Sequence, residues 1–200
     1  PVPSSDDRSR GVFVAGKTLL VFAHDDEAAA FAREGVPHLV TGVGKVNAAL
    51  ELTRALAAEG EGLDGVVVLG TAGIVAEGPR LDAVYQISAV VQHDFSLPSP
   101  RFELAGELVA EGAVIATGDV FVHDDAQRER IAGLGATLVD MESYAYASVC
   151  RRLGVPLRVF KSPSDFADSS TTMEEWDGVA VSKSDQLLRF VAERLPRLLD

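Results

Sequence analysis

Cysteine is almost absent from this sequence, and so are long apolar runs. Cys150 is the only cysteine among 200 residues, so no disulfide can form within the chain and a reducing, cytoplasmic location is expected. Because its neighbours follow a helical pattern, we interpret Cys150 as core packing rather than as a nucleophile. No apolar run approaches the ~20 residues of a membrane-spanning helix, so no membrane partner is expected.

Positive charge is scarce as well. The chain has 18 lysines and arginines against 30 aspartates and glutamates, a formal net charge of −12, and no basic run. Proteins that bind the phosphate backbone gather lysine and arginine on one face, so no nucleic-acid partner is expected. A small nucleoside remains compatible with an acidic protein, because a few local groups are enough to bind it.

Histidines with metal-ligand spacing are also missing. The four histidines are His24, His38, His93 and His123. Their spacing matches no metal motif, so we expect neither a metal nor another cofactor. His24 could approach a binding site, but a surface position is the simpler interpretation.

Length and composition predict one globular domain. With 47% hydrophobic and 24% charged residues, a chain of 200 residues can bury a sizeable core. The polar opening, residues 1–10, is predicted to be a disordered tail and not a signal peptide. Residues 11–200 are predicted to form the single domain.

Apolar patterns along the chain predict alternating strands and helices. Strands are expected at 19–23, 37–41, 65–70, 83–91, 113–117 and 156–161. Helices are expected from about residue 25 and at 45–59, 124–132, 142–153 and 179–199. A turn of small residues, 71–73, is expected to end the third strand. The alternation predicts a three-layer α/β/α domain around a mixed, largely parallel, twisted sheet, with binding residues just past the carboxyl ends of strands.

The glycine-rich segment 41–47 can be tested against two nucleotide-binding templates. The dinucleotide fingerprint needs a third glycine where Asn47 stands. The P-loop needs a glycine where Leu39 stands and a serine or threonine where Val46 stands. Both templates fail, which leaves either a structural turn that opens a helix or part of another kind of site.

Two acidic segments follow expected strands. Asp165 and Asp168 lie three residues apart where an α/β sheet places its active site, which suggests acid–base chemistry. The alternative is that Ser164 or Asp165 caps the next helix. At 139–142 two carboxylates flank a methionine where a strand meets a helix, and they are either helix N-terminal charges or acceptors for sugar hydroxyls.

Several short segments stand in a distinctive order. They are TGVGKV at 41–46, GTAG at 70–73, GDVFV at 118–122, and VDME at 139–142 followed by SDFAD at 164–168. Each is weak alone, but together they resemble the nucleoside phosphorylase and nucleosidase superfamily, most of all the methylthioadenosine/adenosylhomocysteine nucleosidases. The resemblance implies a nucleoside phosphorylase-like fold, cleavage of the N-glycosidic bond of a purine nucleoside in methionine salvage, and a homodimer in which a neighbouring subunit often completes the 5′ pocket.

The resemblance implies two catalytic residues. Asp165 matches the acid that protonates purine N7 as the glycosidic bond breaks. Protonation makes the base a neutral leaving group, so an acid whose pKa is raised by burial between sheet and ligand is valuable. Glu27 matches the acidic loop and is the candidate for holding and activating water, with Asp26 as an immediate competitor.

The resemblance also implies substrate contacts at Val43, Thr71, Phe121, Val122, Met141 and Glu142. Glu142 and Met141 match the pair that contacts ribose hydroxyls, and Thr71 matches a small hydroxyl residue beside the sugar. Phe121 matches the aromatic stacked on the base, and Val122 the residue whose backbone reads the base edge. An anionic Glu142 would stabilise the positive charge of an oxocarbenium-like state.

Departures from the family pattern leave alternatives open. Asp140 stands where the family usually has glutamate, and Lys161–Ser162–Pro163 is an unusual approach to Ser164–Asp165. Trp176 is either part of the 5′ pocket or ordinary packing.

Three functions compete. The superfamily's phosphorylases place arginines at two stretches that here read HDDE (24–27) and VVLG (67–70). Since phosphate needs arginine or backbone donors, hydrolysis is favoured over phosphorolysis. A non-catalytic purine-binding protein of the same fold is the third possibility, although such a protein is expected to have lost one of its acids.

Overall fold

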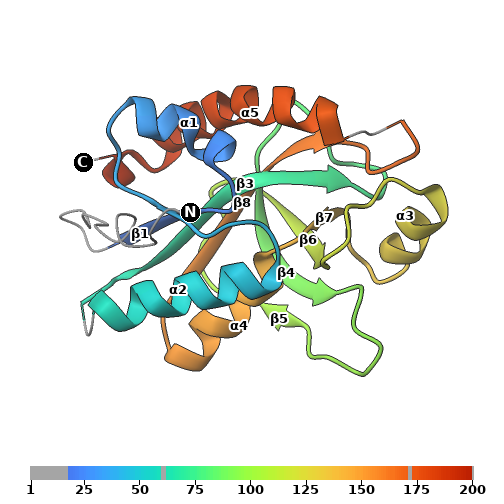
Figure 1. Cartoon of the computed structure of the whole chain (residues 1–200), viewed down its shortest axis with the longest axis horizontal. Coiled ribbons are helices and arrows are strands. Elements are labelled where there is room, and N and C mark those ends of the chain that lie inside the picture. Colours follow the sequence, from blue (N-terminus) through green and yellow to red (C-terminus); the bar gives the residue numbers. More distant parts are fainter. Residues whose placement is uncertain (1–17, 60–61, 171–172, 200) are drawn as a thin grey trace, which may run out of the picture.

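A computed structural model describes residues 18–59, 62–170 and 173–199 of the chain (Figure 1). The helices are α1 (Asp25–Arg33), α2 (Lys45–Glu59), α3 (Asp125–Ala132), α4 (Ser143–Leu153) and α5 (Met173–Arg194), with a 3-10 turn at Pro196–Leu198. The strands are β1 (Thr18–Phe22), β2 (Leu39–Val40), β3 (Gly65–Ile74), β4 (Tyr85–Gln92), β5 (Phe102–Glu103), β6 (Glu111–Thr117), β7 (Leu138–Asp140) and β8 (Leu157–Asp165). The expected tail, residues 1–10, and the side chain of Trp176 lie outside what is described.

The strands form one mixed sheet whose middle closes on itself. Its order is β2-β1-β3-β7-β6-β4-β5, and β8 pairs with both β3 and β4. The β3–β7, β4–β5 and β4–β8 pairs are antiparallel, and the others are parallel. The mixed, largely parallel sheet confirms the prediction. The ring β3-β7-β6-β4-β8 was not part of the predicted three-layer arrangement.

Helices cover the sheet from two sides. In Figure 1, α1 and α5 lie together above the strands, and α2 and α4 lie together below them. Phe31 of α1 and Leu187 of α5 pack on Phe22 and Phe160, whereas Leu52 of α2 packs in a separate core on the α4 side. None of the helices in the described parts of the chain is long and apolar enough to cross a membrane.

Cys150 lies on the buried face of α4, as expected from its helical surroundings. Its side chain is buried, and burial raises the pKa of the thiol to about 12. A thiol held in the neutral form is a poor nucleophile, so packing accounts for this residue.

The turn predicted at residues 71–73 is wrong, because β3 continues through it. All ten residues of β3 are buried, and its second half pairs with the end of β8. Small residues are needed there for packing. A Cβ on Gly73 would lie 2.8 Å from the Cβ of Ala167, and one on Gly70 would lie 3.0 Å from Glu27 Oε1. The absence of side chains therefore serves close packing of a strand rather than a turn.

The end of β8 also differs from the prediction. The strand was expected to stop at Lys161 but continues to Asp165, and the next helix begins only at Met173. The alternative in which Ser164 or Asp165 caps that helix is therefore wrong. Both residues instead lie at the carboxyl end of a parallel strand, where α/β proteins bind ligands.

Candidate active site

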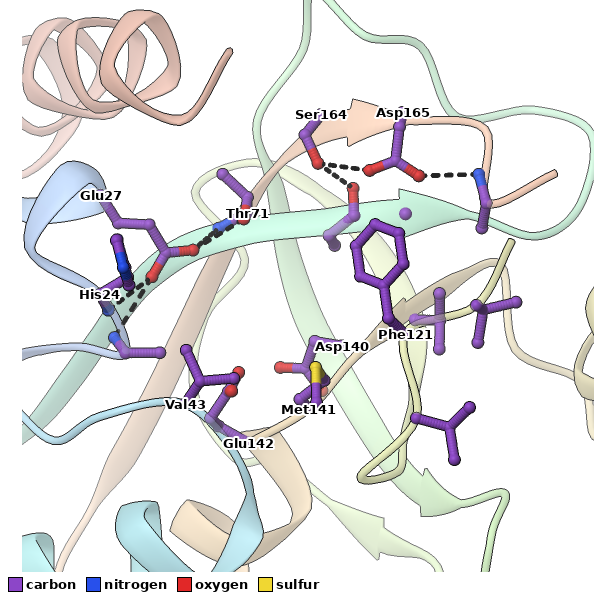
Figure 2. A pocket seen from close by; sticks show the side chains of 17 residues that line it. His24, Glu27, Val43, Thr71, Phe121, Asp140, Met141, Glu142, Ser164 and Asp165 are labelled. Carbon is purple, nitrogen blue, oxygen red and sulfur yellow. Dashed lines mark hydrogen bonds between the residues drawn. The ribbon is translucent and has the colours of Figure 1, made fainter. Parts of the chain in front are cut away.

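The predicted site residues come together around one pocket at the carboxyl ends of β3, β7 and β8 (Figure 2). The pocket encloses about 740 Å³, counting the space at its mouth, which suits a small ligand. All eight predicted residues line it: Glu27, Val43, Thr71, Phe121, Val122, Met141, Glu142 and Asp165. Sequence reasoning had not assigned Val120, Val139, Ser164 or Ala167 to the lining, although each is a close neighbour of a predicted residue.

Glu27 is fixed at one end of the pocket by four hydrogen bonds. Its Oε1 accepts from the N–H and the hydroxyl of Thr71, both at 2.7 Å. Its Oε2 accepts from the N–H groups of Ala23 and His24, both at 3.2 Å. The side chain is only 3% exposed, and it completes a capping box at the start of α1. The capping box fixes the carboxylate group in the pocket wall.

The neighbours of Glu27 take other positions. The described lining includes Glu27 but not Asp26, whose carboxylate is partly exposed and 3.5 Å from His24 Nδ1. His24 is the N-cap of α1 and lines the pocket while staying partly exposed. His24 is therefore partly at the surface, as expected, and also part of the pocket wall. Asp26 lies outside the pocket wall.

Asp165 lies at the end of β8 with both carboxylate oxygens held. Ser164 Oγ donates to Oδ2 at 2.6 Å, and the Ala167 N–H donates to Oδ1 at 2.8 Å. Ala167 has φ +48, a left-handed conformation that is uncommon outside glycine, so the tight turn after the strand is built around this carboxyl. Asp165 is only half-buried by the protein itself.

Asp168 has a different environment, although it was expected to share the acid–base segment. Its carboxylate accepts from the N–H and the hydroxyl of Ser170, at 2.9 and 2.6 Å. These hydrogen bonds hold the pKa of Asp168 below its ordinary value. The described pocket lining includes Asp165 and not Asp168.

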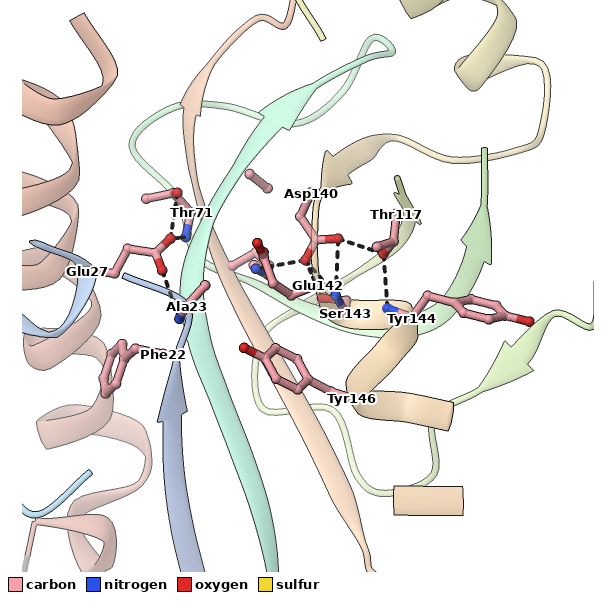
Figure 3. A network of polar contacts seen from close by, with 12 residues as sticks. Phe22, Ala23, Glu27, Thr71, Thr117, Asp140, Glu142, Ser143, Tyr144 and Tyr146 are labelled. Atoms are coloured by element: carbon pink, nitrogen blue, oxygen red, sulfur yellow. Dashed lines mark hydrogen bonds and ion pairs between the residues drawn. The ribbon is translucent and has the colours of Figure 1, made fainter. Parts of the chain in front are cut away.

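The two carboxylates at 139–142 divide the two roles that the sequence left open (Figure 3). Asp140 accepts from the Ser143 N–H at the start of α4 and from the Ser143 and Thr117 hydroxyls, the last at 2.6 Å. Glu142 makes no capping hydrogen bond with its side chain, and its Oε1 accepts from the Gly44 N–H at 2.9 Å. Asp140 therefore stabilises the start of α4 while it also lines the pocket, and Glu142 lines the pocket without capping the helix.

Lys161 is a buried cation that sequence reasoning missed. It lies on β8, is 1% exposed, and its Nζ is 2.9 Å from Asp140 Oδ2. Burial alone lowers the pKa of Lys161, but the carboxylates of Asp140, Glu27 and Glu142 outweigh it and hold that pKa above its ordinary value. A lysine inside a buried strand requires such partners, and this requirement was the available signal.

Glu142 titrates differently from an ordinary carboxyl group. Burial and the nearby charge of Asp140 raise its pKa to about 8, against the opposing effects of Lys161 and the Gly44 N–H. Glu142 therefore binds a proton more readily than an ordinary carboxyl group. Positive charge that approaches this carboxyl would favour the anion expected from the sequence.

Much of the remaining pocket wall is apolar. Phe121 and Val122 come from the segment after β6, and Val139 and Met141 come from the end of β7. Figure 2 shows the Phe121 ring facing the side of the pocket that carries Asp165. An aromatic face beside a carboxyl group suits a flat heteroaromatic ligand that also accepts a proton.

Metal ligation is not indicated. Across residues 18–59, 62–170 and 173–199, no group of three His, Cys, Asp or Glu side chains could hold a metal ion.

Known proteins of similar sequence and structure agree with this geometry. A family model described as the phosphorylase superfamily matches residues 103–195. The 5′-methylthioadenosine/S-adenosylhomocysteine nucleosidase of Anoxybacillus flavithermus is 30% identical, over 78% of this chain and 80% of the relative. The chain belongs to the phosphorylase superfamily. The aminodeoxyfutalosine nucleosidase of Helicobacter pylori is also 30% identical, over 66% of this chain and 67% of that protein.

Solved structures of the superfamily share the fold. The 5′-methylthioadenosine/S-adenosylhomocysteine nucleosidase of Neisseria meningitidis, in complex with methylthio-immucillin-A, superposes with a TM-score of 0.76. The superposition covers 90% of this chain and 98% of that one at 23% sequence identity. The nucleoside phosphorylase-like fold implied by the sequence is thereby confirmed.

Proposed function

We propose that this chain hydrolyses the N-glycosidic bond of a purine nucleoside of the 5′-methylthioadenosine or S-adenosylhomocysteine type, releasing the base and a ribose derivative. The main support is that Glu27, Glu142 and Asp165, from three separate elements, line one pocket together with the Phe121 ring. The relatives named as nucleosidases support the same reaction class.

Asp165 is proposed to act on the base. Phe121 stacks on the purine, and Val122 offers its backbone to the base edge. As the glycosidic bond breaks, its electron pair moves to the purine and Asp165 delivers a proton to N7. Ser164 and the Ala167 N–H orient the carboxyl for this transfer. A bound purine would complete the burial of Asp165, which would favour its protonated form.

Glu142 is proposed to bind the sugar, with Met141 beside it. In the oxocarbenium-like state the sugar carries positive charge, and an opposite charge nearby lowers the pKa of a carboxyl group. The Glu142 carboxyl, whose pKa is raised in the chain alone, would thus shift toward its anion as that charge develops. The electrostatic interaction would be stronger in the transition state than in the bound substrate, as catalysis requires.

Glu27 is proposed to handle water. Its carboxylate accepts the proton of a water molecule as that oxygen bonds to C1′ of the sugar. Thr71 and the two N–H groups at Oε2 fix the orientation of the carboxylate, which reduces reorganisation during the reaction.

Glu142→Ala is expected to weaken ribose recognition. The ratio of kcat/KM for a ribonucleoside to that for its 2′-deoxy counterpart should fall about 10- to 150-fold, because loss of a carboxyl–hydroxyl contact costs about 1.5–3 kcal/mol. Steady-state kinetics with both substrates measures this ratio. If the wild type cleaves ribo and deoxyribo substrates equally well, Glu142 does not bind the 2′-hydroxyl.

Phosphate is not expected to be consumed. Within the described lining of the pocket there is no arginine or lysine to hold a phosphate ion. We expect free sugar when methylthioadenosine, adenosylhomocysteine, inosine and adenosine are assayed with and without phosphate. A phosphate-dependent sugar 1-phosphate would establish phosphorolysis instead. Binding of all four nucleosides without turnover would establish a non-catalytic purine-binding protein.

A homodimer is also proposed. Apolar side chains are exposed near the pocket on α2, at Val46 and Leu50, and after β4, at Phe95 and Leu97. Contact between Lys45 and Asp94 brings these two segments together. Sedimentation equilibrium tests the proposal, and a monomer at micromolar concentration would contradict it.

The cytoplasmic location stays a prediction.

A further inference from the structure

Two of the sequence segments that carry the family resemblance contain charged residues without a role in the proposed reaction. Lys45 is the first residue of α2, directly after the glycine-rich turn, and Asp119 precedes the segment that carries Phe121. In the structure they meet each other and a third residue, Asp94, from the segment after β4.

These three residues form a closed set of contacts. The Lys45 N–H donates to Asp119 Oδ1 at 2.7 Å, and the Asp119 N–H donates to Asp94 Oδ2 at 2.8 Å. The Lys45 ammonium completes the cycle, because its Nζ lies 2.7 Å from Asp94 Oδ1. The same Nζ lies 3.2 Å from Gln92 Oε1 and 4.0 Å from Asp119 Oδ2. Both backbone and side chains therefore hold the three segments together.

The Lys45–Asp94 pair is more shielded than an ordinary surface ion pair. Its side chains are 20% and 19% exposed, whereas those of Arg80 and Asp82 are 72% and 80% exposed. Partial burial raises the pKa of Asp94, but hydrogen bonds from Lys45 and from the Asp119 N–H outweigh this effect and bring it below its ordinary value. Exposed ion pairs contribute little, so the shielding matters for the strength of this contact.

Each end of the cluster continues directly into the pocket. Gly44, next to Lys45, donates its N–H to Glu142 Oε1, and Val43 lines the pocket. On the other side, Val120 and Phe121 follow Asp119 and line the pocket too. Gly44 has φ +95, and a Cβ there would lie 3.1 Å from Asp119 Oδ1, so the turn packs against this carboxylate as only glycine readily can.

We propose that Lys45, Asp94 and Asp119 form a clip that holds the sugar-side turn (residues 42–44) in register with the base-side segment (residues 119–122). The inference rests on the proposed function, since it assigns the two segments to sugar and base. The residues of the clip are positioning residues, because the described pocket lining consists of other side chains. They act through the Gly44 N–H on Glu142 and through the chain on Phe121.

A double-mutant cycle with Lys45→Met and Asp94→Asn tests the clip. Each variant is expected to lower kcat/KM about tenfold, mainly through KM, and the double variant about as much as the stronger single one, because contacting residues couple. The preference for ribo over 2′-deoxy substrate should shrink in parallel, since Glu142 loses its alignment. Lys45→Arg, which keeps the charge, should recover part of the loss.

Asp82→Asn is the matched control, since it breaks an exposed ion pair away from the described pocket. It should leave kcat/KM and substrate preference unchanged. A purely structural cluster would lower the thermal midpoint without changing the ribo-to-deoxy ratio. That result, or effects of the single variants that multiply independently, would overturn the clip.

Amide hydrogen exchange distinguishes failure of the clip from failure of the proposed function. In Lys45→Met and Asp94→Asn, the amides of residues 43–45 and 119–121 should exchange faster than in the wild type, without any substrate present. If the wild type cleaves no purine nucleoside, the proposed function fails, yet exchange still reports on the clip. Unchanged exchange in both segments would overturn the clip even in an active enzyme.

Discussion

Asp165→Asn is expected to lower turnover of purine nucleosides at least about 100-fold, since general acids contribute about 10²–10⁴-fold. Asparagine has nearly the same shape, and its carbonyl oxygen can still accept from the Ala167 N–H while its amide donates to Ser164 Oγ. The variant should therefore fold and bind purine, but it cannot deliver a proton to N7. Single-turnover kinetics together with calorimetric binding separates the two properties.

Asp168→Asn is the matched control, because the same change is made to a carboxylate that faces Ser170. It should leave turnover close to that of the wild type. A nucleoside whose leaving group departs without protonation should be cleaved by Asp165→Asn almost as well as by the wild type. If Asp165→Asn keeps more than about a tenth of its activity on ordinary purine nucleosides, a loss below the range of general acids, the proton comes from elsewhere.

Glu27→Gln is expected to lower kcat about 100-fold or more with little change in nucleoside affinity, because it removes the acceptor for the water proton. This substitution also carries a structural cost that Asp165→Asn avoids. All four partners of the carboxylate are donors, so the new amide group must face two of them. Buried donors without acceptors cost about 1–3 kcal/mol each, so the thermal midpoint should also fall.

Asp26→Asn provides the control for Glu27→Gln, since it changes the preceding residue of the same helix turn outside the described pocket wall. Activity is compared at a temperature well below the midpoint of both variants, and nucleoside affinity is measured at that temperature. Loss of affinity in proportion to turnover would indicate a disturbed pocket rather than a lost base. Near-normal turnover of Glu27→Gln would move water handling to another residue.

The pocket lining could be predicted because its residues belong to short segments at or just after the ends of strands. The carboxyl ends of parallel strands meet at one edge of a sheet, so strand positions and a family resemblance were enough to bring the eight residues together. Glu27 could not be separated from Asp26 by this argument. That distinction depends on the first turn of α1, where Glu27 turns inward to the capping box and Thr71.

The ends of the strands near the site could not be predicted, because the local composition there indicates turns rather than strands. Glycine and alanine in the second half of β3 indicate a turn, but in the structure they make room for Ala167 and Glu27. Proline is rare inside strands, yet Pro163 lies in β8. It pairs with Ala72 of β3 next to a register shift between Ala72 and Gly73, where the irregular pairing tolerates a proline. Tertiary packing overrides the local signal in both strands.

Contacts between segments far apart in the chain also could not be predicted from the sequence. The two residues of β5 are too few to produce a periodic pattern, and the pairing of β8 with β4 that closes the ring leaves no local trace. Lys161 and Asp140 are 21 residues apart, and Lys45 and Asp94 are 49 apart. Charge pairing of this kind is specified by the completed fold and not by spacing along the chain.

The burial of Cys150 makes this chain a convenient background for site-specific labelling. Its thiol is the only one in the sequence and lies on the buried face of α4. Its high pKa keeps it neutral, whereas maleimide reagents attack thiolates. A cysteine introduced at an exposed position, such as Val46 on α2 or Val120 before Phe121, would therefore carry a fluorophore or spin label at a single defined point. A pair of such labels would report the distance between α2 and the segment that carries Phe121, and Cys150 would not have to be replaced.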